Sequence, residues 1–282
     1  MIAGQIWWAV LAFFVSGVLE LAALYFLLPL LQRGGAERNN YRGQLIPVAA
    51  GISLPLVLLI CYFPYRYFQI DSSAILIGII LMAFLGLIDD LLGNRDTMGF
   101  RGHIKSLLHG TLTTGGLKML MGGVVALYTA AFFSAAWYWW LLNGLIIALS
   151  TNLLNLLDLR PGRAIKGFFI FLLPVMILAP NIERWLLLPV LGAVTAYFPF
   201  DLRARAMMGD SGSNILGFVL GYLAASVPGF GFKIGTLIFL IGINLLAEKV
   251  SLSAIIEKVG WLRYIDHLGR EMKMDDQQRT AG

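Results

Sequence analysis

Long apolar runs dominate this chain of 282 residues and are separated by short polar segments. The runs cover residues 6–31, 45–63, 73–92, 117–136, 137–157, 164–179, 184–200, 212–227 and 232–250. Each is close to the roughly 20 residues that a helix needs to cross a bilayer. The pattern predicts an all-α, polytopic integral membrane protein with about nine transmembrane helices. A tight turn near residues 134–137 marks the least distinct boundary, between the fourth and fifth helices.

The composition agrees with a membrane protein, because 59% of the residues are hydrophobic and only 13% are charged. Soluble domains carry about 25% charged residues. The first run is too long for a signal-peptide core and is expected to stay as a membrane anchor. The one cysteine, Cys61, excludes an intrachain disulfide framework and a Cys-rich zinc site, and is expected to be a buried thiol. Residues 1–282 are expected to form a single transmembrane domain with a charged, helical tail from about residue 251.

Lysine and arginine predict the orientation of this domain. All but three of the 21 basic residues fall on one predicted side, and the exceptions are Arg66, Arg184 and Lys233. The positive-inside rule therefore predicts an N-terminus outside and a C-terminus in the cytoplasm, which an odd number of spans satisfies. The net charge of +5 is explained by anionic lipid headgroups, so a nucleic-acid partner is not expected.

Residues 100–116 are too polar for the middle of a bilayer and are expected to form a short interfacial helix. Alternatively, the fourth span begins at Ile104, which would carry Lys118 deep into the membrane. A lone lysine there costs about 2.5 to 3.5 kcal/mol, so the interfacial helix is preferred.

Three groups of polar residues fall at the predicted cytoplasmic ends of the helices. The first is Asp89-Asp90 at the end of the third run. A helix end that reaches water would explain it, but two adjacent carboxylates repel each other and oppose the helix dipole. A nearby cation or metal would relieve both penalties, which favours a functional role.

The second group, Asn152, Asn155 and Asp158, has a spacing of three residues and is expected to form a ridge on one helical face. Hydrogen bonding between helices is the simpler explanation for such a ridge. The following segment, Leu159-Arg160-Pro161-Gly162-Arg163, adds two guanidinium groups, whose geometry suits phosphate oxygens.

The third group, Gly209-Asp210-Ser211-Gly212-Ser213, precedes the eighth run and follows the basic pair Arg203 and Arg205. A helix N-cap would explain part of this pattern. Free N–H groups at a helix start also bind phosphate, and aspartate oxygens bind Mg²⁺.

These motifs together resemble the polyprenyl-phosphate N-acetylhexosamine-1-phosphate transferases, a glycosyltransferase 4 type family in the superfamily of the phospho-N-acetylmuramoyl-pentapeptide transferase. The shared pattern is an Asp-Asp pair, a lysine (Lys105 in this chain), the Asn-x-x-Asn-x-x-Asp ridge and the Gly-Asp-x-Gly-Ser loop, in that order. The first polar loop also fits, with Asn40-Tyr41-Arg42-Gly43 and Ile46-Pro47 before Gly51. The resemblance covers roughly residues 33–220.

The chain departs from the family pattern at three places. The family's Asp-Gly-x-Asp-Gly is replaced by Asp158-Leu159-Arg160-Pro161-Gly162, so its second acid is absent. Phe200 stands where the family has an asparagine, and of the histidine-rich loop only His267 is left. These departures indicate a divergent member rather than the peptidoglycan enzyme.

The resemblance implies a membrane transferase that moves a sugar-1-phosphate from a UDP-sugar to undecaprenyl phosphate, releases UMP and initiates a cell-envelope glycan. The single domain would then be catalytic, with its active site on the cytoplasmic face of the plasma membrane. Asp210 would be the principal ligand of Mg²⁺, or of Mn²⁺ in its place, with Asp158 in support. Asp89 and Asp90 would orient or deprotonate the carrier phosphate, and Lys105 would hold its oxygens. The residues expected to bind substrate are Arg42, Asn152, Asn155, Arg160, Arg163, Arg205, Ser211 and Ser213.

The expected partners are the carrier lipid, the UDP-sugar and the bilayer, and a homodimer is compatible with this organisation. A transporter or lipid flippase is one alternative, although its site would be expected near the bilayer midplane. A catalytically inactive homologue is the other, and the altered segment after Asp158 is compatible with it. A phosphatidyltransferase of the CDP-alcohol type would need an Asp-Gly-x-x-Ala-Arg motif, which the chain lacks.

Overall fold

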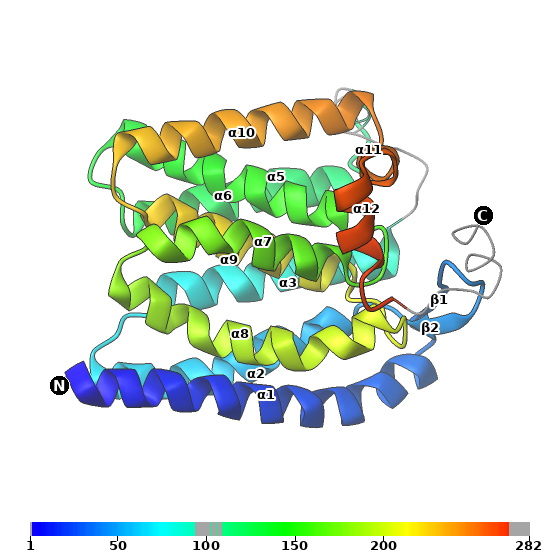
Figure 1. Cartoon of the computed structure of the whole chain (residues 1–282), viewed down its shortest axis with the longest axis horizontal. Coiled ribbons are helices and arrows are strands. Elements are labelled where there is room, and N and C mark those ends of the chain that lie inside the picture. The colour runs from blue at the N-terminus through cyan, green and yellow to red at the C-terminus, as the bar shows by residue number, and fades with distance from the viewer. Residues whose placement is uncertain (1, 94–101, 103–105, 107–108, 271–282) are drawn as a thin grey trace.

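The computed structural model describes residues 2–93, 102, 106 and 109–270 as a bundle of roughly parallel helices (Figure 1). Its elements are α1 (Ile2–Arg33), β1 (Glu37–Asn39), β2 (Leu45–Pro47), η1 (Ala50–Ile52), α2 (Ser53–Tyr62), η2 (Phe63–Phe68), α3 (Ser73–Leu92), α5 (Thr114–Ala131), α6 (Trp137–Leu157), α7 (Arg163–Leu178), α8 (Asn181–Leu202), α9 (Gly209–Ser226), α10 (Phe230–Lys249), α11 (Leu252–Lys258) and α12 (Gly260–His267). The all-α prediction is confirmed, because the sheet is a single two-stranded hairpin within the described residues.

Each of the nine apolar runs overlaps one helix, and these helices are α1, α2, α3, α5, α6, α7, α8, α9 and α10. The break between α5 and α6 falls at residues 132–136, where the sequence predicted a tight turn. Six helical segments of the described chain are long and apolar enough to cross a membrane: Ile6–Arg33, Ala50–Phe68, Ser73–Leu92, Trp137–Leu157, Arg184–Leu202 and Phe230–Lys249. The expected number of nine spans is not confirmed, because α5, α7 and α9 are not among these six segments. Helix α7 has only 16 residues, and α9 begins with a polar turn.

The prediction for residues 45–63 is wrong in its first part. These residues begin with strand β2, which pairs antiparallel with β1, and continue into the 3₁₀ turn η1. The α-helix starts only at Ser53. Pro47 has no N–H to donate, and Ala49 takes a left-handed conformation with φ of 61°, so a continuous helix cannot pass through this segment.

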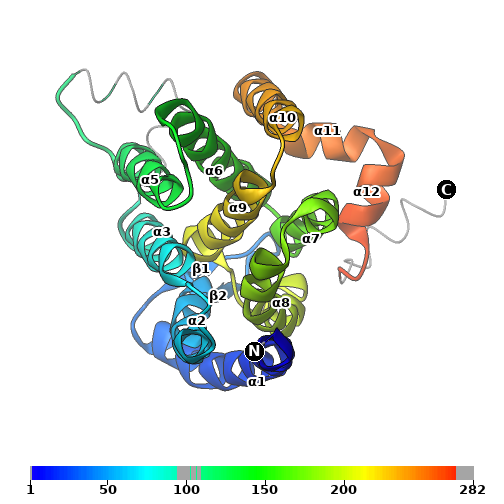
Figure 2. The same ribbon diagram turned by 90° about the vertical axis from the view of Figure 1, so that its left-hand side faces the viewer.

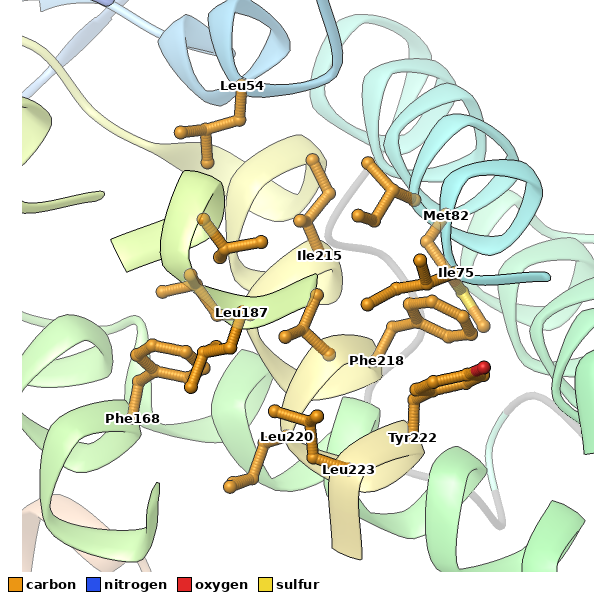
Figure 3. Packing of buried hydrophobic residues seen from close by; sticks show 14 of the residues in the cluster. Leu54, Ile75, Met82, Phe168, Leu187, Ile215, Phe218, Leu220, Tyr222 and Leu223 are labelled. Atoms are coloured by element: carbon orange, nitrogen blue, oxygen red, sulfur yellow. The ribbon is translucent and has the colours of Figure 1, made fainter. Parts of the chain in front are cut away.

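Helix α9 forms the centre of the bundle, and every residue from Ser211 to Ala225 is buried. It packs against α6, α3 and α7, and the view along the helices shows it enclosed by its neighbours (Figure 2). Phe218 and Tyr222 extend toward Ile75 and Met82 of α3 (Figure 3). The outer helices keep large apolar side chains exposed, such as Phe26 in α1, which suits a surface that faces lipid.

The chain alternates in direction, so the C-terminal ends of α1, α3, α6, α8 and α10 lie at one end of the bundle with the starts of α5, α7 and α9 (Figure 1). The hairpin and helices α11 and α12 lie at this same end, which we call the polar end. Arg66, Arg184 and Lys233 belong to η2 and to the first turns of α8 and α10, at the opposite end. The described basic residues therefore separate as the sequence predicted, and the tail is helical as far as His267.

Candidate active site

Four helices bring charged and polar side chains together at the polar end. Asp89 and Asp90 lie in the last turn of α3, and Asp210 lies in the first turn of α9. Asn155 lies in the last turn of α6, and Lys118 lies near the start of α5. Residues separated by up to 121 positions in the sequence thus meet at one place.

The side chain of Lys118 joins two of these acids. Its Nζ lies 2.8 Å from Asp89 Oδ2 and also forms an ion pair with Asp210 Oδ2. The side chains of Asp89, Lys118 and Asp210 are 17%, 20% and 26% exposed. Asn155 completes the cluster when its amide is oriented so that both atoms have partners: it then donates to Asp210 Oδ1 at 2.7 Å and accepts from Lys118 Nζ at 3.2 Å. We call Asp89, Lys118, Asn155 and Asp210 the lysine cluster.

Asp90 has a different role from its neighbour. Its carboxylate accepts hydrogen bonds from the backbone N–H groups of Asp210 at 2.8 Å and Ser211 at 3.0 Å. This negative charge at the start of α9 is favourable for the helix dipole. Two of the N–H groups that the sequence offered as phosphate donors are therefore already bound to Asp90. Arg38, which the sequence did not single out, donates to the backbone carbonyl of Asp90 at 2.7 Å.

Two glycines allow these close approaches. Gly209 has a φ of +71°, which is costly for other residues, and a Cβ there would lie 2.5 Å from Asp90 Oδ2. A Cβ on Gly86 of α3 would overlap the backbone carbonyl of Asp210. The glycine before Asp210 is therefore needed for the contact between α3 and the start of α9.

The hairpin segment fixes the loop that leads into α9. Met207 N donates to Pro47 O at 2.8 Å, and in return Ala50 N donates to Met207 O at 3.1 Å. Gly51 N donates to Met208 O at 3.0 Å. Because residues 45–52 are not α-helical, their backbone groups are free to form these hydrogen bonds, which hold the loop just before Asp210.

The ridge on α6 does not act as one unit. Asn155 lies beside Ser213, at 3.2 Å between the amide and Oγ, and joins the lysine cluster. Asn152 instead donates to Asn244 of α10 at 2.6 Å, which is the interhelical hydrogen bond that was the simpler explanation. At 3.6 residues per turn, each step of three residues rotates the side chain by about 60°, so the ends of the ridge diverge.

Asp158 follows the last residue of α6 and is half-buried. Burial, followed by the negative charges of Asp201 and Asp210, raises the pKa of Asp158 well above its ordinary value. The sequence did not assign a role to Asp201, which accepts a hydrogen bond at 2.8 Å from the N–H of Gly162 at the start of α7. Asp201 therefore supports the altered segment after Asp158.

Three of the predicted substrate-binding arginines lie at the polar end, where Arg160 and Arg205 are exposed and Arg42 is half-buried. Arg42 and Arg160 both lie over the ring of Tyr41, with guanidinium carbons 5.2 and 6.0 Å from its centroid. Arg205 is exposed in the loop before α9. The two predicted serines are buried: Ser211 Oγ donates to Met208 O at 3.2 Å, and Ser213 contacts Asn155.

Arg163 is not brought to the carboxylates of the lysine cluster. Its Nε and Nη2 each donate to Asp266 of α12 at 2.8 Å, and its Nη1 donates to Ser253 of α11 at 2.6 Å. Arg270 also binds Asp266, at 2.7 and 3.2 Å. We call Arg163, Asp266 and Arg270 the arginine clamp, which attaches α12 to the start of α7.

The clamp controls the ionisation of its carboxylate. Burial raises the pKa of Asp266, but the hydrogen bonds and charges of Arg163 and Arg270 outweigh burial and lower that pKa to about 2. Asp266 is therefore ionised at neutral pH. Glu257, Asp266 and His267 place their ligand atoms within 4.8 Å of one another, but Asp266 is already bound by the two arginines, which argues against a metal there.

Lys105, which the sequence placed on the carrier phosphate, lies outside the described residues, as do residues 100, 101, 103, 104, 107 and 108 of the proposed interfacial helix. The last residues of that proposed helix, 114–116, belong instead to the first turn of α5. Lys118 is the residue that sequence reasoning counted only as a loop charge. The position of Lys118 in the sequence could have revealed its role, because it lies in the first turns of an apolar helix, where an unpaired ammonium group is energetically costly. Such a lysine indicates an acidic partner on another helix.

The chain belongs to the glycosyl transferase family 4, because the model of that family matches residues 72–227, which is more than half of the chain. No curated protein matches the chain significantly. The matched region runs from α3 to the end of α9 and so contains the whole lysine cluster. Membership confirms the family resemblance and supports a polyprenyl-phosphate sugar-1-phosphate transferase activity in general.

Proposed function

We propose that the protein transfers an N-acetylhexosamine-1-phosphate from a UDP-sugar to undecaprenyl phosphate, with release of UMP, on the cytoplasmic face of the plasma membrane. An oxygen of the carrier phosphate attacks the β-phosphorus of the UDP-sugar. The bond between this phosphorus and the oxygen that bridges it to the α-phosphorus breaks, and UMP leaves. The product is a lipid-linked sugar diphosphate that would initiate a cell-envelope glycan.

The lysine cluster is the observation that carries this proposal. Phosphoryl transfer needs groups that position two phosphates and neutralise their oxygens, and it needs little covalent chemistry from the protein. Two carboxylates, an ammonium and an amide converge from α3, α5, α6 and α9 at the end of an apolar bundle. A water-soluble sugar nucleotide and a membrane-anchored phosphate can both reach such a position.

The carboxylates also fit the chemistry of a divalent cation. Mg²⁺ prefers oxygen ligands, and Asp210 and Asp89 direct carboxylate oxygens at the same cationic group. Asp210 and Asp89 would hold the metal, with Asp158 close to Asp210 in support. When bound, the metal would neutralise phosphate oxygens as the reaction proceeds.

The remaining roles belong to side chains of the protein. Asp90 holds the start of α9 in place through two backbone hydrogen bonds, which positions Asp210. Arg42 and Arg160, which share the ring of Tyr41, would pair with the nucleotide phosphates. A strong base is unnecessary, because a phosphomonoester has a second pKa near 6 and is largely dianionic at neutral pH.

The position of the cluster favours an enzyme over a transporter or flippase. Transport sites are expected near the bilayer midplane, often at interrupted helices. Here the charged residues lie in the last turns of α3 and α6 and the first turns of α5 and α9.

The proposal is tested by an assay of the purified protein in lipid nanodiscs that contain undecaprenyl phosphate, with Mg²⁺ and a panel of UDP-N-acetylhexosamines. We expect UMP release with at least one sugar, together with a lipid-linked product. Omission of the carrier lipid should stop UMP release. If no sugar nucleotide in the panel is turned over, the transferase proposal fails and the inactive homologue becomes the better account.

A further inference from the structure

Lys118 occupies the space between the two carboxylates to which we assigned the metal. Its Nζ lies 2.8 Å from Asp89 Oδ2, pairs with Asp210 Oδ2, and lies 3.2 Å from the oxygen of the correctly oriented Asn155 amide. An oxygen from each of three helices thus faces this ammonium. The carboxylates point at one cationic centre, and a side chain of the protein supplies it.

A divalent cation bound by Asp89 and Asp210 would use the oxygens that Lys118 now contacts. Mg²⁺ sits about 2.0 to 2.1 Å from its ligands, so the ammonium and the metal would be close neighbours with like charge. Like charges at such a separation repel strongly in a partly buried site. The carboxylates can therefore hold the ammonium or the metal, but not both in these positions.

We propose that Lys118 is a resident counter-ion that competes with the divalent metal for Asp89 and Asp210 and is displaced when the metal binds. This inference rests on the proposed function for the identity of the metal. Before substrates arrive, the ammonium keeps the two acids from repelling each other. After displacement it is free to pair with phosphate oxygens, because lysine combines a point charge with a flexible stem of four carbons.

The backbone around Lys118 is compatible with such an exchange. Helix α5 is fixed at its start by Thr113, whose Oγ1 accepts a hydrogen bond from Gly116 N at 3.0 Å. The Cα of Lys118 is thus anchored while its partly exposed side chain has solvent beside it. Only rotamer changes of one side chain are needed, and such changes are fast compared with catalysis.

The test measures Mn²⁺ binding by electron paramagnetic resonance in nanodiscs without either substrate, for the wild type and for Lys118→Met. Removal of the competing ammonium should lower the Kd for Mn²⁺ by about tenfold, on the scale of one partly buried ion pair. Lys249→Met is the matched control, because this exposed lysine ends α10 at the same end of the bundle. Its Kd should stay within about twofold of the wild type, as expected for a screened surface charge.

An unchanged or higher Kd in Lys118→Met would overturn the proposal. So would an equal gain of affinity in Lys249→Met, because the effect would then reflect general charge rather than competition.

A second measurement uses the wild type alone and so does not depend on folding of the variant. Acetic anhydride labels free amines, and mass spectrometry of the peptide that contains Lys118 reports how much is acetylated. Mn²⁺ should increase acetylation of Lys118 and leave that of Lys249 unchanged. Equal or lower acetylation of Lys118 with the metal would overturn the proposal.

These measurements separate the inference from the proposed function. If Lys118 competes with Mn²⁺ but no UDP-sugar is turned over, the counter-ion proposal stands and the transferase proposal fails. If a UDP-sugar is turned over but Lys118 does not compete with Mn²⁺, the transferase proposal stands and the counter-ion proposal fails.

Discussion

The polar end of the bundle contains two clusters of charge that differ in almost every physical respect. In the arginine clamp, two guanidinium groups surround one carboxylate, and Arg163 and Asp266 are only 5% and 3% exposed. In the lysine cluster, two carboxylates share one ammonium and all three groups are partly exposed. The clamp is saturated with fixed hydrogen bonds, whereas the lysine cluster has an excess of acid and solvent access. The first arrangement suits attachment of a helix, and the second suits exchange of a cation or phosphate.

The largest effect is expected from a substitution that breaks the arginine clamp. Asp266→Ala leaves Arg163 buried without its carboxylate, which should lower the free energy of unfolding by about 3 to 5 kcal/mol. The thermal midpoint of the purified protein measures this loss. At temperatures below the new midpoint we expect turnover to persist, because the clamp does not belong to the lysine cluster. A loss of turnover with an unchanged midpoint would reverse the roles assigned to the two clusters.

The pH dependence of the clamp follows from its acid. The pKa of Asp266 is lowered to about 2 in the folded protein, whereas an unfolded aspartate titrates near 3.9. The stabilisation is therefore fully present above about pH 4 and is lost as the pH falls through about 2. Between pH 5 and 8 the difference in midpoint between wild type and Asp266→Ala should stay constant. A difference that disappears within this range would contradict the account of the clamp.

The next largest effect is expected from a substitution that removes one charge from the lysine cluster. Asp210→Asn keeps the shape of the side chain, and turnover should fall by about 10²- to 10³-fold, as when a key electrostatic contact to a transition state is removed. The rate of UMP release measures it. Asp71→Asn is the matched control, because this exposed acid lies before α3 at the opposite end and should leave turnover unchanged. Full activity of Asp210→Asn would show that the reacting groups lie elsewhere.

A smaller effect is expected from a substitution that displaces the lysine cluster without changing any of its side chains. A Cβ at Gly86 would overlap the backbone of Asp210, so Gly86→Ala should push α3 and α9 apart. A misplacement of about 1 Å can lower turnover by about 10²-fold. Gly242→Ala in α10 meets open space and provides the control. If both variants keep the wild-type rate, the close packing of α3 on α9 is not what positions Asp210.

The smallest effect is expected for an exposed side-chain contact beside the clamp. Glu257 and His267 lie 3.3 Å apart, and their side chains are 48% and 39% exposed. Glu257→Ala should change the free energy of unfolding by less than about 1 kcal/mol, because surface pairs contribute little. The thermal midpoint checks this directly against Asp266→Ala on the same helix pair. A loss as large as that of Asp266→Ala would mean that burial does not distinguish the two pairs.

Much of the fold could be predicted because apolar length alone determines where a membrane helix can lie. Each predicted run overlaps a helix, and the Asp-Asp and Gly-Asp motifs do meet at one end of the bundle. The start of α2 could not be predicted from hydropathy, since residues 45–52 are apolar but pair with the loop before α9. That pairing depends on tertiary contacts that no local pattern contains.

The partners of the charged residues were harder to predict than their positions. Arg163 was expected to bind phosphate because it follows the acidic ridge, but it pairs with Asp266, 103 residues further along the chain. Lys118 was assigned only to a charged loop, and its two acids come from α3 and α9. A sequence shows which residues need a partner, whereas helix packing decides which partner each one finds.

The most direct test of the central claim follows the β-phosphorus of the donor. The protein is incubated with undecaprenyl phosphate, Mg²⁺ and a UDP-N-acetylhexosamine that carries ³²P in its β-phosphate. Transfer of a sugar-1-phosphate should move the label into the lipid fraction, with one UMP released for each lipid labelled. Label that stays with the nucleotide as UDP while sugar enters the lipid, or no labelled lipid at all, would contradict the assignment of the lysine cluster as a sugar-1-phosphate transfer site.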